Sequence, residues 1–203
     1  MFHLIRRAAE WAAAITGHAA AAVRRLPPRV ALFYVSALAL AVVRRDRFTL
    51  SSATRPADLE ALLELARGAT SVAEIGTGPG WSSIALALVE PGRQIVSFDV
   101  EPRAAEHYAR LVPRSVRDRI QFVIGEGSTG AAGAPEVDFV FIDSSHQLEE
   151  TVATFEAWRP KLRSPATVAF HDYGNPAYPG VEEAVEQLGL DGEARGGVFV
   201  WRA

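Results

Sequence analysis

The fold of this chain is decided by residues 71–89, which read SVAEIGTGPGWSSIALALV. The first five residues predict a buried strand, and the run that starts at Trp81 predicts a helix. Three glycines lie between them, at positions 76, 78 and 80. Glycine has no side chain to block a ligand, so the backbone amides of such a turn can approach one at the start of a helix. The stretch therefore predicts a ligand-binding bend at the carboxyl edge of a sheet.

From residue 56 onward, helical and strand patterns alternate, which is typical of an α/β, Rossmann-like doubly wound sheet. We expect strands at 71–75, 94–99, 120–124, 137–143, 167–170 and 198–202. We expect helices at 56–67, 81–89, 102–111, 147–162 and 181–188, with a loop rich in glycine and alanine at 125–135. This organisation predicts one domain over residues 51–203, preceded by a helical extension over residues 1–50.

The extension differs in charge from the rest of the chain. Its first 47 residues carry eight arginines against Glu10 and Asp46, a net charge of +6, whereas the remainder has 13 basic and 22 acidic residues, a net charge of −9. Apolar spacing predicts an amphipathic helix over 2–26 and a buried helix over 30–43, which is too short to span a bilayer. We expect a lid or a dimerisation element. The alternatives are a membrane-surface helix and a signal peptide at residues 1–25.

Composition excludes several classes of protein. The chain has no cysteine, so it has no disulfide framework, no thiolate zinc site and no cysteine nucleophile. The absence of cysteine is compatible with a reducing compartment, and we expect a cytoplasmic protein. The net charge of −3 argues against a generally basic nucleic-acid binder. We therefore expect no nucleic-acid partner and no association with a membrane.

Asp99 ends the second expected strand, 23 residues after Gly76. A carboxylate at that strand end can accept both hydrogen bonds of a ribose diol, so the glycine turn and Asp99 together predict a nucleoside ligand. The dinucleotide pattern GxGxxG requires a glycine where this chain has Trp81. That residue disfavours a nicotinamide dinucleotide.

At these residues the chain resembles the class I S-adenosylmethionine-dependent methyltransferases, whose first motif is an acidic residue, any residue and then GxGxG. The resemblance covers residues 50–203 through the blocks EIGTGPG at 74–80, SFD at 97–99, GEGS at 125–128, VDFVFIDSSH at 137–146, WRPKL at 158–162, AFHDY at 169–173 and PGV at 179–181. It implies a seven-stranded sheet whose last strands form an antiparallel edge. It also implies an enzyme that uses S-adenosyl-L-methionine as its cofactor.

The resemblance implies which residues bind this cofactor. The glycine turn would face the methionine portion, Ser82 would lie near its carboxylate, and Asp99 would bind the ribose hydroxyls. Glu126 and the two residues after it would line the adenine site, and Glu74 would hold the sulfonium end. The complete implied set is Glu74, Gly76, Thr77, Gly78, Gly80, Ser82, Asp99, Glu126, Gly127, Ser128 and Asp143.

Two more strands deliver ionisable residues to the same edge: Asp143 ends the fourth, and His171-Asp172 follow the fifth. One branch of small-molecule O-methyltransferases holds a divalent ion between an aspartate and an acidic pair at these positions. His171 replaces the first member of that pair. By resemblance, Asp143, His171 and Asp172 are the candidate metal ligands. Magnesium prefers oxygen ligands, whereas a set containing histidine could hold manganese or another transition ion.

Without a metal, His146 or His171 could act as general base, because imidazole titrates near neutrality, with Asp143 as their partner. The plainer alternatives are that Asp143 caps a helix or binds the cofactor and that His171 packs in a loop.

We expect O-methylation of a small-molecule hydroxyl, such as a phenol, a sugar or a secondary metabolite. Two alternatives remain, a nicotinamide-dependent oxidoreductase and a non-catalytic cofactor-binding module. The second rests on two substituted positions, His171 and Ser145. Ser145 stands where sugar-modifying members of the family carry an aspartate.

Overall fold

A computed structural model describes residues 2–101 and 104–203, with side chains from Ala13 onward. The strands are β1 Ser71–Ile75, β2 Gln94–Asp99, β3 Ile120–Ile124, β4 Val137–Ile142, β5 Leu162–His171, β6 Glu193–Arg195 and β7 Val198–Arg202. The helices are α1 Phe2–Arg25, α2 Pro28–Arg44, α3 Arg47–Ser52, α4 Pro56–Leu65, α5 Trp81–Val89, α6 Ala105–Ala109, α7 Arg114–Arg117, α8 Gly127–Gly130, α9 Leu148–Trp158 and α10 Pro179–Gln187.

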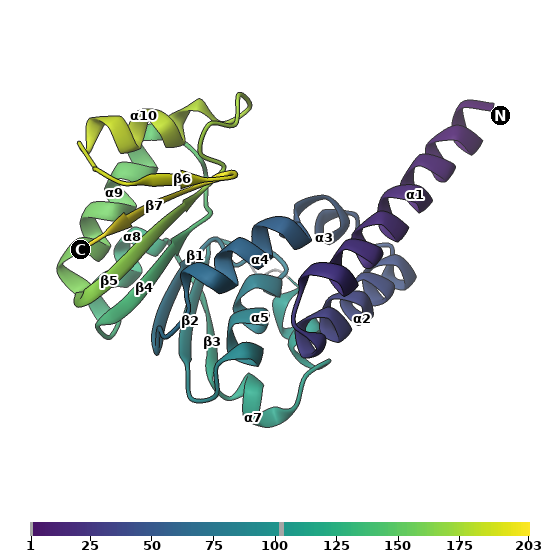
Figure 1. Ribbon diagram of the computed structural model, residues 1–203, viewed down its shortest axis with the longest axis horizontal. Helices are drawn as coiled ribbons and strands as arrows, with labels where there is room; N and C mark the ends of the chain where they lie inside the picture. Colours follow the sequence, from purple (N-terminus) through teal and green to yellow (C-terminus); the bar gives the residue numbers. More distant parts are fainter. Residues whose placement is uncertain (1, 102–103) are drawn as a thin grey trace.

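The strands form one sheet in the order β3-β2-β1-β4-β5-β7-β6 (Figure 1). Strands β1 to β5 run parallel to one another, whereas β7 runs antiparallel to both β5 and β6. The expected α/β fold, with seven strands, an antiparallel edge and helices preceding the sheet, is therefore confirmed.

Side chains alternate between the two faces of the sheet, as the two-residue period of a strand requires. Phe139 and Phe141 of β4 belong to one hydrophobic cluster, which includes residues of α1, α2, α4 and α5. Val140 and Ile142 belong to a second cluster with residues of α9 and α10. The two groups of helices lie on opposite sides of the sheet (Figure 1). Burial on both faces explains why β4 is almost entirely apolar.

The two central strands, β1 and β4, are neighbours although β2 and β3 lie between them in the sequence. Strand order reverses here, and ligands of such sheets bind in the crevice beyond the strand ends. The backbone N–H of Asp143 donates to the Ile75 carbonyl at 2.7 Å. Gly76 has a φ of +101°, and a Cβ at this position would lie 1.8 Å from the Asp143 carbonyl oxygen. Only glycine allows these two strand ends to approach so closely.

The N-terminal helices share a core with the sheet. The ring of Trp81, at the start of α5, meets Phe33 and Tyr34 of α2 edge-on at centroid distances of 6.3 and 4.9 Å, and Tyr108 at 5.6 Å. Asp46, which caps α3, accepts a hydrogen bond of 2.8 Å from the Tyr108 hydroxyl. The start of α1 extends beyond the rest of the chain (Figure 1). Within the described ranges, no helix combines the length and the hydropathy needed to cross a membrane.

The differences from expectation are mostly at element ends. The helices expected at 2–26 and 30–43 are confirmed as α1 and α2, but the helix expected at 147–162 ends at Trp158, and β5 begins at Leu162. Residues 102–103 of the helix expected at 102–111 lie outside the described residues, and α6 covers Ala105–Ala109. The short β6 is the seventh strand that the resemblance implied, and no sequence pattern had placed it.

The prediction of a loop at 125–135 was wrong, because this stretch forms α8 and a 3₁₀ turn at Ala131–Gly133. Tertiary contacts explain the difference. The Gly127 carbonyl accepts a hydrogen bond of 2.9 Å from the Trp158 indole, and a Cβ at Gly127 would collide with the side chain of Ile75. A short glycine-rich helix of this kind depends on its neighbours, since glycine has low helix propensity.

Candidate functional site

A cavity of about 1160 Å³ lies at the carboxyl edge of the sheet. It is lined by the glycine turn after β1, the end of β2, the start of α8, the loops after β4 and β5, and part of α3 and α4. The structure brings together twelve of the fourteen residues predicted for the site, namely Gly76, Thr77, Gly78, Ser82, Asp99, Glu126, Gly127, Ser128, Asp143, His146, His171 and Asp172. Glu74 and Gly80 do not line it.

Asp99 is joined to the glycine turn. Its carboxylate accepts a hydrogen bond from the backbone N–H of Gly78 at 2.8 Å and another from the N–H of Glu101 at 3.0 Å. Gly78 has a φ of +49°, and a Cβ there would meet no atom within 4 Å. The backbone of the turn is therefore open toward the cavity at Gly78, beside a carboxylate held in a fixed orientation.

Glu74 lies behind the turn and is fully buried. Its carboxylate accepts hydrogen bonds from the hydroxyls of Ser82, Ser83 and Ser97. Burial raises the pKa of Glu74 to about 7, and the three hydroxyl donors oppose this shift. The expectation that Glu74 faces the cofactor does not match its position. Glu74 instead ties the first turn of α5 to β2.

Two other predicted residues are also structural in their contacts. A Cβ at Gly80 would lie 2.8 Å from the Ala105 Cβ, so this glycine allows α5 and α6 to pack closely. The Thr77 hydroxyl lies 2.7 Å from the Ser97 hydroxyl in the buried network around Glu74. Glu126, in contrast, is exposed and lines the cavity.

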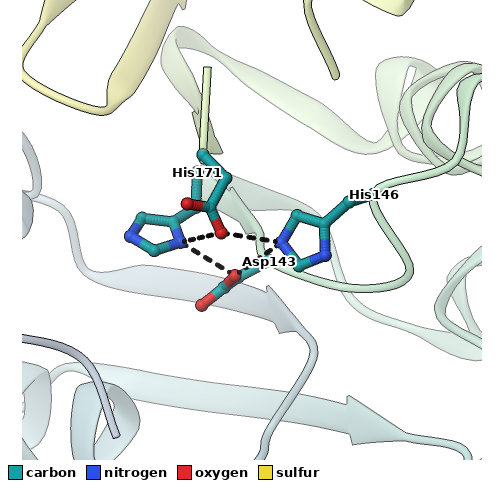
Figure 2. Close-up of side chains that lie close together, drawn as sticks. Asp143, His146 and His171 are labelled. Atoms are coloured by element: carbon teal, nitrogen blue, oxygen red, sulfur yellow. Dashed lines mark hydrogen bonds and ion pairs between the residues drawn. The ribbon is translucent and has the colours of Figure 1, made fainter. Parts of the chain in front are cut away.

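The other end of the cavity holds a cluster of two aspartates and two histidines, Asp143, His146, His171 and Asp172. Asp143 and His146 follow β4, whereas His171 ends β5 and Asp172 follows it. Figure 2 shows Asp143, His146 and His171 pointing toward one another. Each residue offers one ligand atom, and these atoms all lie within 4.8 Å of one another, so the four could hold a metal ion.

The distances within this cluster are short and similar. His146 Nε2 lies 3.3 Å from Asp143 Oδ1 and 3.2 Å from Asp172 Oδ2. His171 Nδ1 lies 3.0 Å from the same Asp143 oxygen and 3.3 Å from the same Asp172 oxygen. Each imidazole therefore faces both carboxylates, and each carboxylate faces both imidazoles.

These contacts shift the protonation of every member. Burial disfavours charged imidazoles, but hydrogen bonds and charge from the two carboxylates outweigh it, raising the pKa of His146 to about 9 and that of His171 to about 12. Burial likewise opposes ionisation of Asp143 and Asp172, yet the histidines lower the pKa of both carboxyl groups. These shifts favour protonated imidazoles beside ionised carboxylates.

Two cavity residues were missed by sequence reasoning. Asp58 of α4 places Oδ2 at 3.9 Å from Nε2 of His171, and Arg55 also lines the cavity. Asp58 lies in α4 and Arg55 immediately precedes that helix, more than 80 residues before the cluster in the sequence, and no motif marks them. Tyr178, which also lines the cavity, stacks on His146 with ring centroids 4.3 Å apart.

Comparison with known proteins gives a family. A model described as "Methyltransferase domain" matches residues 73–173, about half of the chain. Methyltransferase ptaI from Pestalotiopsis fici is 28% identical over 118 residues, which cover 55% of this chain and 34% of that protein. The match thus spans about a third of that curated relative.

Solved structures share the fold. An O-methyltransferase from Bacillus cereus, in complex with S-adenosylhomocysteine, superposes with a TM-score of 0.65 at 18% identity, covering 81% of this chain and 88% of that one. CalS11, a TDP-rhamnose 3'-O-methyltransferase, superposes with a TM-score of 0.59 at 22% identity, covering 72% and 78%. The family match favours a methyltransferase over the nicotinamide-dependent alternative. Together with the glycine turn joined to Asp99, these findings show that the chain belongs to the class I S-adenosylmethionine-dependent methyltransferase family.

Proposed function

We propose that this protein transfers the methyl group of S-adenosylmethionine to a hydroxyl oxygen of a small molecule. The observation that carries the proposal is the division of one cavity into two chemically different ends. Asp99 and the Gly78 backbone lie at one end, and the cluster of Asp143, His146, His171 and Asp172 lies at the other. One end suits a nucleoside, and the other suits a reacting hydroxyl.

The residues present fit the cofactor. The cavity volume of about 1160 Å³ is slightly larger than the upper limit of the usual range for ligand pockets, about 1,000 Å³. The cavity therefore leaves room for an acceptor beside the cofactor. Carboxylates at Asp99 and Glu126 suit the ribose hydroxyls and the adenine amino group, because ionised carboxylates accept hydrogen bonds. When bound, S-adenosylmethionine supplies an electrophilic methyl group on a positively charged sulfur.

We assign the binding of this cofactor to the turn at 76–78, Ser82, Asp99 and residues 126–128. Asp99 is held by the Gly78 N–H, and a carboxylate with about four lone-pair sites can accept the two ribose hydroxyls as well. Glu74 acts through Ser82, because its bond to that hydroxyl fixes the first turn of α5. Glu74 is thus a positioning residue for the cofactor site.

At the other end, the cluster would orient the acceptor hydroxyl and take up its proton. Methyl transfer is an in-line displacement, so the protein contributes mainly by holding the acceptor oxygen close and by removing its proton. Asp143 is the proposed centre of this arrangement, since one of its oxygens lies 3.0 Å from His171 and 3.3 Å from His146. Phe48 and Tyr178 line the cavity and would exclude water on the acceptor side.

The charge of the lining supports a neutral or cationic acceptor. Asp58, Glu149 and Glu150 line the cavity, and Arg55 is the only arginine or lysine among the described lining residues. Like charges close together in a cavity repel, so a phosphorylated acceptor would bind poorly. The likeness to a TDP-rhamnose methyltransferase supports a hydroxyl as the reacting group, but this lining argues for an acceptor without a nucleoside diphosphate.

We propose further that residues 1–50 act as an appendage of the domain at 51–203 and cover the acceptor side. Support comes from Phe48, which lines the cavity and is 41% exposed, and from Tyr34, whose hydroxyl donates to the Thr54 carbonyl at 3.2 Å. The extension thus contributes Phe48 to the cavity lining, and the Tyr34 hydrogen bond connects it to Thr54, which also lines the cavity. The same helices leave Leu32 and Val43 exposed, which is compatible with dimerisation.

The experiment is a methyl-transfer assay with isotopically labelled S-adenosylmethionine and a library of hydroxyl compounds. The library contains pairs that differ only by a phosphate group. We expect labelled product from at least one neutral or cationic member and much less from its phosphorylated counterpart. Transfer to nitrogen acceptors alone would contradict the assignment to oxygen, and binding of the cofactor without transfer to any class of acceptor would favour a non-catalytic module.

A further inference from the structure

We propose that the exposed apolar side of α2, together with the arginines at its two ends, docks on the surface of a lipid bilayer that contains anionic lipids. This inference goes beyond the proposed function, because docking does not require methyl transfer. It departs from the expectation of no membrane association, which rested on the charge of the chain as a whole and not on where that charge lies.

Helix α2 is apolar on every side. From Val30 to Val43 the sequence contains no charged residue. A helix of this composition is normally buried all round. One side of α2 does pack inside the protein, since Phe33 and Tyr34 are buried and meet the ring of Trp81. The opposite side has no such cover.

This opposite side forms a continuous apolar face. Leu32 and Val43 are 71% and 80% exposed, and Ser36 and Ala39 lie between them at spacings of four, three and four residues. Residues at these spacings share one face of a helix. Val42 is also exposed. We call Leu32, Ser36, Ala39 and Val43 the α2 face. Contiguous exposed apolar surface of this kind marks contact with another protein or with a membrane.

A groove extends the α2 face toward α1. The two helices lie side by side at one end of the molecule (Figure 1). The groove at their junction has a volume of about 450 Å³, and its lining is apolar throughout: Val23, Leu26, Pro28, Ala31, Leu32 and Val35. Leu32 belongs both to this groove and to the α2 face. The two therefore form one apolar surface that reaches from the end of α1 to the end of α2.

Arginines lie at both ends of this surface. Residues 13–54 contain one acidic residue, Asp46, whose carboxylate is bonded to Thr49 and Tyr108. The same segment contains six arginines, all exposed: Arg24, Arg25, Arg29, Arg44, Arg45 and Arg47. Among the described residues, Arg25 is the only one of the six with a carboxylate within 4 Å, at 2.6 Å from Glu60. Positive charge therefore flanks the apolar surface.

This combination fits an anionic bilayer better than a second copy of the chain. In a symmetric dimer the same patch faces itself, so arginines would be brought against arginines, and like charges across an interface repel. A bilayer with anionic lipids supplies phosphate groups for the guanidinium groups and hydrocarbon for the apolar side chains. Arginine suits that boundary, because its stem can lie along apolar surface while its head pairs with phosphate.

The two parts of the surface act together. Each arginine near an anionic membrane strengthens binding about fivefold, which corresponds to about 1 kcal/mol. This attraction acts within a Debye length, about 10 Å at 0.1 M salt. The apolar side chains add the burial that a purely electrostatic contact lacks. We therefore expect reversible binding that lies on the bilayer, is sensitive to salt and needs both parts.

The test is sedimentation of the full chain with two kinds of vesicle. One kind is phosphatidylcholine alone, and the other is equal parts of phosphatidylcholine and phosphatidylglycerol. We expect binding to the mixed vesicles at least tenfold tighter than to the neutral ones, and weaker binding as sodium chloride is raised. Equal affinity for both kinds, or binding to neither, would overturn the proposal.

A first pair of variants tests the apolar part. Leu32→Gln combined with Val43→Gln makes the α2 face polar with residues that a helix tolerates. We expect this double variant to bind the mixed vesicles at least tenfold more weakly. Ile124→Gln, at a side chain of β3 that is 67% exposed, is the matched control and should bind as the unmodified protein does. Circular dichroism checks the fold of each variant. Unchanged affinity in the double variant would overturn the proposal.

A second pair tests the charge. Arg24→Gln combined with Arg29→Gln removes two arginines beside the groove, and we expect more than tenfold weaker binding to the mixed vesicles. Arg110→Gln combined with Arg114→Gln removes two exposed arginines elsewhere and changes the net charge equally. This control should change binding less than about twofold. Equal losses in the two double variants would show that overall charge governs binding, which would overturn the role of this surface.

Analytical ultracentrifugation tests the alternative occupant, a second copy. We expect the Leu32→Gln and Val43→Gln double variant to sediment as the unmodified protein does. A dimer of the unmodified chain that dissociates in this variant would assign the surface to a second copy and overturn the proposal. None of these measurements uses the cofactor or an acceptor. Failure of bilayer binding and failure of methyl transfer are therefore distinguishable.

Discussion

The carboxylate of Asp99, at the end of β2, accepts a hydrogen bond of 2.8 Å from the backbone N–H of Gly78. This bond joins the turn after the first strand to the tip of the second. The two features that suggest a nucleoside site are separated by 21 residues in the sequence, yet they form one rigid corner of the cavity. Any ligand that contacts the Asp99 carboxylate also meets the turn.

Loss of this carboxylate tests the cofactor site. We expect Asp99→Ala to weaken binding of S-adenosylmethionine and S-adenosylhomocysteine by more than about 1 kcal/mol, the scale of a lost hydrogen bond to a charged group. Isothermal titration calorimetry measures the change. Glu106→Ala, at an exposed carboxylate of α6, should bind both ligands as the unmodified protein does. Unchanged affinity in Asp99→Ala would remove Asp99 from the site.

The histidines are expected to affect turnover without affecting cofactor affinity. Both imidazoles orient the carboxylates that would take up the acceptor's proton, and proton removal contributes about 10²–10⁴-fold to rate, so His146→Ala or His171→Ala should lower kcat at least a hundredfold. The dissociation constant for S-adenosylhomocysteine should change less than about twofold, since both side chains lie at the acceptor end. Full turnover in both variants would reject a catalytic role for the cluster.

Glu74 is expected to make stability depend on pH. Burial raises its pKa from 4.5 to about 7, so the folded protein keeps a proton that the unfolded chain releases near pH 4.5. The folded state binds more protons between these two pKa values, and its stability therefore falls as pH rises from about 4.5 to 7. Urea denaturation of Glu74→Gln should lack this contribution. A difference in unfolding free energy between the two proteins that stays constant across this range would contradict the assignment.

Arg93 tests the packing that supports the site. This arginine is buried, and its guanidinium donates to the carbonyls of Ala69 and Leu86, at 2.8 and 2.9 Å, and to that of Ala66. We expect Arg93→Met to lower the unfolding free energy by about 2 kcal/mol or more, because buried carbonyls lose their donors. Arg114→Met, which removes an exposed ion pair with Asp118, should change it by less than about 1 kcal/mol. Equal effects would contradict the role given to Arg93.

The sequence was most informative where local pattern and chemistry coincide. The unit of β1, glycine turn and α5 could be predicted because each part has its own signal within 20 residues, and Asp99 could be added because parallel strands end at a common edge. The seventh strand came from the resemblance alone, and the structure shows it as β6, which pairs with β7. Those signals do not depend on contacts between distant elements.

What could not be predicted depends on tertiary contacts. Glu74 and Asp99 are both carboxylates associated with the glycine motif. The packing of α5 against β2 buries Glu74 and leaves Asp99 at the cavity, and the sequence does not show this difference. Asp58 reaches His171 from α4, and no pattern links two residues 113 positions apart. The sequence suggests His146 as a base, but it does not show that this side chain faces both Asp143 and Asp172, because its orientation follows from a backbone turn with positive φ.

The most direct test of the account is calorimetry of the purified full chain with S-adenosylmethionine, S-adenosylhomocysteine and NAD in parallel. The account predicts saturable binding of the first two at one site per chain. We expect dissociation constants in the micromolar range, which correspond to a binding free energy of about −8 kcal/mol. It also predicts no measurable binding of NAD. Binding of NAD in preference to both sulfur nucleosides, or binding of none of the three, would contradict it.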